Sequence, residues 1–158
     1  MSDFAIKRKD MIRKKNDFYV KSAEMKDSIE KFDKKRSETE EGISRIPTDL
    51  PPELQSQVDT AVENVRNQLK EESNKLDQEA DKISIEADEA MDLADKVETE
   101  LREKSKKMSS LSGVPLIGSF AETKGNELMD QAEQMVDLRQ ETQKYQDELI
   151  SYRNKLKR

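Results

Sequence analysis

The sequence predicts an all-α protein: an elongated three-helix antiparallel coiled-coil rod with one very long central helix. Three observations predict this fold. Charged residues make up 41% of the 158 residues and hydrophobic residues only 32%, which is little apolar material for a compact core. Apolar residues recur at intervals of three, four and seven, as in helices that pack along a seam. Glycine and proline occur only in residues 42–52 and 113–125, so three long segments remain uninterrupted.

Disorder is the alternative for so charged a chain, and the regular apolar spacing argues against it.

The first predicted helix spans about residues 3–42. One face of it carries a large apolar residue at every seventh position, which predicts burial along a seam: Phe4, Met11, Phe18, Met25 and Phe32. Residues 1–36 hold 12 basic and 7 acidic side chains, a net charge of +5.

The second predicted helix spans about residues 53–109. Asp49 is the expected N-cap, and a proline is well tolerated in the first turn that follows. At 1.5 Å per residue the helix would be about 85 Å long. Its seam includes the small residues Ala80, Ala87 and Ala94, which allow neighbouring helices to approach closely. Residues 37–104 hold 8 basic and 20 acidic side chains, a net charge of −12, so the basic first helix should fold back antiparallel onto this one.

The third predicted helix spans about residues 120–157, with Gln131 and Thr142 as polar seam positions that set the register. The first and third helices are each too long to occupy separate halves of the central helix. We expect them to cover about 53–93 and 72–109 of it, and to overlap near 72–93. A second apolar face lies there, formed by Ile85, Met91 and Leu93. The prediction is one helical domain, 1–158, three helices thick in its middle and two at each end.

The chain contains neither cysteine nor histidine, which excludes thiolate nucleophiles, imidazole bases and the usual zinc ligands. Neighbouring carboxylates such as Glu71 and Glu72 are expected to be solvent-exposed charges on a helix surface. We therefore expect no catalytic, cofactor-binding or metal-binding residues, no cofactor, and no enzyme activity. The first residues lack an apolar stretch and no segment resembles a membrane span, so we expect neither a cleavable signal peptide nor a transmembrane helix.

The second break contains the most apolar stretch of the chain, at a predicted end of the rod. One interpretation is structural: Gly113 ends the central helix in a left-handed C-cap, and the apolar residues plug the hairpin. The other is an exposed docking patch for a protein partner, or a shallow membrane contact. The candidate partner-binding residues are Leu111, Gly113, Leu116, Ile117 and Phe120.

The central helix, a turn bearing Leu111-x-Gly113 and the third helix together resemble the helical-hairpin proteins of bacterial type VII (ESX-like) secretion. In those proteins a W-x-G or L-x-G tripeptide lies at or near the bend. The resemblance covers about residues 50–158. It implies a small leaderless helical protein that pairs with the helical targeting domain of an LXG toxin. The Y-x-x-x-D/E export tail of some members is not matched at Tyr19, Tyr145 or Tyr152, which puts independent export in doubt.

These observations predict a non-catalytic helical interaction protein, and most specifically an accessory or targeting partner that co-folds with a secreted effector. We expect a protein partner or a second copy of the chain, rather than nucleic acid or a membrane. The expected location is the cytoplasm, or outside the cell without a cleavable signal. Two alternatives remain open. One is a self-assembling scaffold, as in a phage or a filament; the other is a membrane or nucleic-acid binder that acts through the basic first helix.

Overall fold

The structure of the protein, a computed structural model, describes residues 3–157, with side chains from residue 5 onward. The described residues form three helices, α1 (Asp3–Ser44), α2 (Pro52–Ser110) and α3 (Gly118–Lys155), and no strand. The all-α prediction is confirmed. Each helix end lies within two residues of its predicted position, because glycine and proline mark both breaks.

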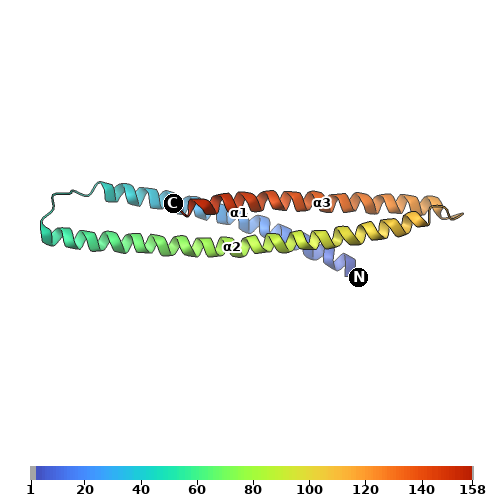
Figure 1. Ribbon diagram of the computed structural model, residues 1–158, viewed down its shortest axis with the longest axis horizontal. Helices are drawn as coiled ribbons and strands as arrows, with labels where there is room; N and C mark the ends of the chain where they lie inside the picture. The colour runs from blue at the N-terminus through green and yellow to red at the C-terminus, as the bar shows by residue number, and fades with distance from the viewer. Residues whose placement is uncertain (1–2, 158) are drawn as a thin grey trace.

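The three helices lie side by side along one long axis, and we call this elongated body the rod (Figure 1). The central helix α2 runs almost its full length. α1 and α3 fold back along α2 from opposite ends, so both are antiparallel to α2 and run in the same direction as each other. The C-terminus of α3 ends beside α1, well short of the loop between α1 and α2 (Figure 1).

The register of α1 on α2 differs from the prediction. Salt bridges join Lys7 to Glu100 and Glu40 to Arg66, so α1 covers a part of α2 that is shifted toward its C-terminal end from the expected 53–93. The reason is the linker at 45–51: it is an extended path that ends at Pro51 with ψ 147° rather than a tight turn. The first turns of α2 therefore project beyond the end of α1.

The register of α3 agrees with the expected 72–109. The Ser105 hydroxyl donates a hydrogen bond to the carbonyl of Gly125, and the Ser73 hydroxyl donates one to the carbonyl of Leu156. α3 thus covers α2 from about its middle to the hairpin end. All three helices pack together where α1 and α3 overlap on α2.

The core lies in this three-helix segment and forms two clusters. In both, small α2 residues face large residues of α1 and α3, and this lets the three helices approach closely. The seam residues named above whose side chains are described are buried: Met11, Phe18, Met25, Phe32, Ala80, Ala87 and Ala94. The same seam of α2 continues toward its N-terminal end, where Leu54 and Val65 are exposed. The side chain of Phe4 lies outside the described residues.

The predicted second apolar face of α2 is only partly correct. Met91 packs against the first core cluster and Leu93 against the second. Ile85, in contrast, is 49% exposed. It follows Ser84, which contacts Gln146 of α3, so the helical rotation of one residue carries Ile85 away from that contact.

Lysines of α1 pair with glutamates of α2, which confirms the predicted pairing of opposite charges. The salt bridges are Lys7–Glu100, Lys14–Glu89, Lys21–Glu86 and Lys35–Glu72, with N–O distances of 2.6 to 2.9 Å. The lysines are spaced by seven or fourteen positions, so they follow one edge of the helix. Such exposed pairs add little to stability individually, because solvent and salt screen them. Their main effect is to favour the antiparallel arrangement over the parallel one.

One ion pair joins α1 directly to α3. Lys26 lies 2.7 Å from a carboxylate oxygen of Glu148, and the pKa of Glu148 is lowered by this hydrogen bond and by the lysine's charge. A carboxylate with a lowered pKa in the folded state stabilises the fold above its ordinary pKa near 4.5, and this contribution is lost as the pH falls through the lowered value.

We therefore expect the Glu148→Gln variant to lose less stability than the wild type when the pH is lowered from neutral to about 3. The matched control is Glu133→Gln, which changes an exposed glutamate of the same helix. Urea unfolding followed by circular dichroism at both pH values measures the difference. An equal loss of stability in the wild type and Glu148→Gln would show that the Lys26 pair does not hold α1 to α3.

Candidate interaction surfaces

The end of the rod that contains the α1–α2 linker has no buried side chain. Between Phe32 and Leu69, which are both buried, every residue is half-buried or exposed. We call residues 33–68 the open arm. It holds only the last turns of α1, the linker and the first turns of α2, because α3 ends before reaching it (Figure 1).

The end of α3 is fixed by side chains of the other two helices. Arg36 of α1 donates a hydrogen bond to the carbonyl of Leu156 at 3.2 Å and another to the carbonyl of Lys155. Ser73 of α2 donates to the same Leu156 carbonyl at 2.9 Å. These donors satisfy the last carbonyl groups of α3, which have no partner within the helix. The open arm therefore begins where these hydrogen bonds hold the C-terminal end of α3.

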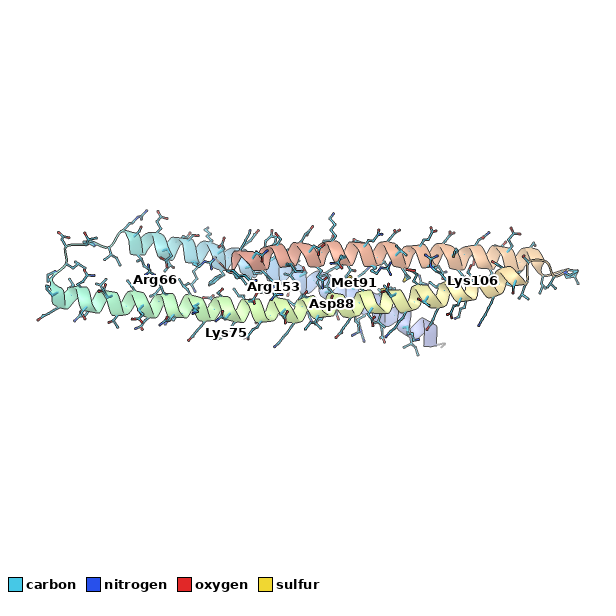
Figure 2. All side chains as sticks on the ribbon, viewed as in Figure 1. Arg66, Lys75, Asp88, Met91, Lys106 and Arg153 are labelled. Atoms are coloured by element: carbon cyan, nitrogen blue, oxygen red, sulfur yellow. The ribbon has the colours of Figure 1, made fainter. Side chains whose placement is uncertain are left out.

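Apolar residues nevertheless continue along the open arm. Those that face its two-helix seam are half-buried: Ile43, Ile46, Leu50, Val58 and Val62. Leu54 and Val65 are exposed. At the base of the arm a groove runs between α1 and α2 just beyond the end of α3, lined in part by Arg36, Arg66, Leu69 and Leu156. Figure 2 shows Arg66 on α2 in this part of the rod.

The predicted capping of α2 by Asp49 is wrong. Pro51 occupies the N-cap position, with no side-chain hydrogen bond to the helix. Pro52 is the first helical residue, and the residue before a proline is held in an extended conformation, so the cap falls at Pro51 and Asp49 lies too early in the chain. The first helical hydrogen bond joins the Gln55 amide to the Pro51 carbonyl at 2.8 Å.

The hairpin between α2 and α3 lies at the opposite end of the rod, and we call residues 111–120 the tip. The predicted left-handed cap at Gly113 is wrong, because no glycine in the described residues has a positive φ. Helix α2 instead ends in tightened turns, in which the Leu111 amide donates to the Met108 carbonyl at 3.0 Å. The left-handed residue of the turn is Leu116, with φ 75°.

The predicted plug is also wrong. Leu111, Ile117 and Phe120 are exposed, and the side chain of Leu116 is fully exposed. Small residues close the hairpin instead. A side chain on Gly118 would meet the Ser112 carbonyl oxygen at 2.2 Å, so only glycine fits there. Ala121 and Gly125 are buried against α2. The intervals of three residues from Gly118 to Ala121 and of four from Ala121 to Gly125 were the sequence signal for this contact.

A polar layer crosses the middle of the rod, where sequence reasoning singled out Thr142 but not Gln146. Both residues are buried. The Gln146 amide donates to Asp88 of α2 at 2.8 Å and to the carbonyl of Ser84 at 3.0 Å. Figure 2 shows Asp88 and Met91 on α2 in this central part. On α1, the Tyr19 hydroxyl is buried, and this burial raises the pKa of Tyr19.

Comparisons of the chain with protein-family models, with curated proteins and with solved structures found no match. Among the helices that the structure describes, none is both long and apolar enough to cross a membrane. We take the open arm and the tip, at the two ends of the rod, as the candidate interaction surfaces.

Proposed function

We propose that the protein is a non-catalytic helical interaction protein, and that its open arm binds an amphipathic helix of a partner protein. The more specific proposal, which rests on the resemblance of Leu111-x-Gly113 to L-x-G proteins, is an accessory partner that co-folds with a secreted effector of a type VII-like system. The bound helix would occupy the place on the open arm that α3 occupies in the middle of the rod.

One observation supports this proposal above the others: no residue from 33 to 68 is buried, although an apolar seam runs through this segment. Short two-helix segments are marginally stable in water because they bury little apolar area. Each Leu or Val that a third helix covered fully would contribute about 1.5–3 kcal/mol. Leu54 and Val65 are exposed now, so a bound helix could bury additional apolar area at both residues.

The charge of the open arm indicates which kind of helix fits. Residues 33–68 hold 5 basic and 8 acidic side chains, a net charge of −3. A partner helix with an apolar stripe and basic flanks would therefore be favoured over an acidic one.

The experiment compares two double variants as baits in an affinity pull-down from the native host. In Leu54→Asp/Val65→Asp the open arm is disrupted, whereas Ile85→Asp/Ile150→Asp places the same charges on exposed residues of the three-helix segment. All four positions are exposed, so we expect both baits to keep the wild-type melting temperature. A partner that the wild type and the control recover, and the arm variant does not, is then purified and mixed with the protein.

The proposal expects a stoichiometric complex with that partner, in which backbone amides of residues 33–68 become protected from hydrogen exchange. Protection elsewhere, with the open arm still exchanging fast, would contradict it. If the open arm instead binds a second copy of the chain, the self-assembling scaffold becomes the better proposal. Recovery of a large effector with a helical N-terminal region would support the type VII-like version.

A further inference from the structure

The tip is the least charged part of a highly charged chain. No acidic or basic residue occurs from 108 to 121, although charged residues make up 41% of the whole sequence. Five large apolar side chains of this stretch are exposed: Leu111, Val114, Leu116, Ile117 and Phe120. Exposed apolar residues that gather in one place usually mark a surface that another phase or molecule covers.

The backbone of the tip displays these side chains outward. Leu116 has φ 75°, a conformation that a branched residue adopts at a cost, and its side chain is fully exposed. The adjacent small residues hold α2 and α3 close together, so the loop protrudes from the end of the rod (Figure 1). The result is a convex apolar surface rather than a groove.

Lysines flank this apolar stretch on both of its helices. We call Lys104, Lys106, Lys107 and Lys124 the lysine collar, and all four are exposed. Figure 2 shows Lys106 on α2 near this end of the rod. Residues 104–124 contain these four lysines and one acidic residue, Glu122, a net charge of +3, whereas the whole chain has −6. Lys124 also pairs with Glu127, just outside this range, at 3.5 Å, so Lys106 and Lys107 of α2 are the lysines to test. The rest of the chain therefore carries −9, and the basic charge at this end is a local feature.

We propose that the tip inserts into the surface of an anionic membrane, with its apolar side chains at the level of the lipid headgroups and acyl chains and the lysine collar against the phosphates. An apolar loop with basic flanks matches such a surface, because the apolar side chains suit the acyl chains and the lysines suit the anionic headgroups. The negative remainder of the rod is repelled by the same surface, so the rod would stand on the membrane by its tip.

A protein partner fits the tip less well than a lipid surface does. Stable protein interfaces use about 20–30 residues on each side and need matched shapes, whereas the tip offers five apolar side chains on a convex loop. A lipid surface accepts apolar side chains without a complementary pocket. The proposal does not depend on the open arm, which lies at the other end of the rod (Figure 1).

The test is co-sedimentation of the full chain with large vesicles of phosphatidylcholine, with and without phosphatidylglycerol. We expect binding to the anionic vesicles, weakened by salt, and little binding to phosphatidylcholine alone. Leu116→Ser/Phe120→Ser should weaken binding by about tenfold or more, because both apolar anchors are lost. Lys106→Glu/Lys107→Glu should weaken it by at least about tenfold, since each lysine near an anionic surface strengthens binding about fivefold.

The matched control is Ile85→Ser/Ile150→Ser, which removes two exposed apolar residues from the three-helix segment and should bind vesicles like the wild type. Melting temperatures show that all variants remain folded. A second measurement uses the absence of cysteine from the chain. A polarity-sensitive dye on Leu116→Cys should shift to shorter wavelength on anionic vesicles, and the same dye on Ile85→Cys should not.

Three results would overturn the proposal. The first is no binding of the wild type to anionic vesicles at low salt, and the second is equal binding by the tip variant. The third combines two observations. The wild type associates with itself at high concentration without lipid, and Leu116→Ser/Phe120→Ser abolishes this association. The dye on Leu116→Cys then responds to protein concentration and not to vesicles. That outcome would assign the tip to contacts between proteins.

Discussion

The Ala87→Asp variant is expected to lose at least about 4 kcal/mol of its unfolding free energy, the largest effect of any substitution considered for this protein. Ala87 is 0% exposed and belongs to the core cluster in which α1, α2 and α3 meet. An aspartate there would bury a carboxylate among apolar side chains of all three helices. The close packing of the helices around a small residue also leaves no room for the larger side chain.

Ala61→Asp is the matched control, because it makes the same change on the same helix at an exposed residue of the open arm. Changes at such surface positions usually alter stability by no more than about 0.5 kcal/mol. Urea unfolding monitored by circular dichroism gives both values. If the two variants unfolded at the same urea concentration, Ala87 could not lie at the meeting point of the three helices.

The Phe18→Ala variant should lose about 3–5 kcal/mol, as is typical when a buried aromatic side chain is removed from a core. Phe18 is fully buried, and it anchors α1 in the first core cluster together with Ile29. Its ring packs edge-on against Tyr19, with the ring centroids 5.9 Å apart. Met11, Met25 and Phe32 are also buried on α1, and Phe18 is the largest fully buried side chain among the described residues. Loss of this anchor should therefore loosen α1 more than it disturbs the hairpin of α2 and α3.

Limited trypsin digestion distinguishes the two regions, because α1 is rich in lysine and arginine. We expect cleavage within α1 to become faster in Phe18→Ala while the α2–α3 hairpin stays protected. Val20→Ala, which truncates a side chain that is 58% exposed on the same helix, should digest like the wild type. A loss of less than about 1.5 kcal/mol in Phe18→Ala would be hard to reconcile with a buried anchor.

Much of the secondary structure followed from local features of the sequence. Apolar residues every seven positions in α1 predicted which side chains are buried, since this spacing places Met11, Phe18, Met25 and Phe32 on one face of any helix. The positions of glycine and proline predicted where each helix ends. The superhelical winding of the helices, and the type VII-like resemblance, stay predictions.

The arrangement at both ends of the rod required the tertiary structure. The register of α1 on α2 depends on the extended path of the linker through Pro51. The spacing of apolar residues in the sequence does not indicate the distance that a linker spans between two helices. Leu116, rather than Gly113, adopts the left-handed conformation, because α2 ends in tightened helical turns and the chain reverses a few residues later. The exposure of Leu54 and of the tip depends on where α1 and α3 stop.

What the sequence determined by itself is therefore the set of helices and the face that each one buries, because both are fixed by residues within a few turns of one another. Only the tertiary structure decided which apolar residues stay uncovered. Whether Leu54 or Phe120 is buried depends on helices whose contact residues lie far away in the chain, and coverage is a property of their packing. The same packing places the open arm and the tip at opposite ends of the rod (Figure 1).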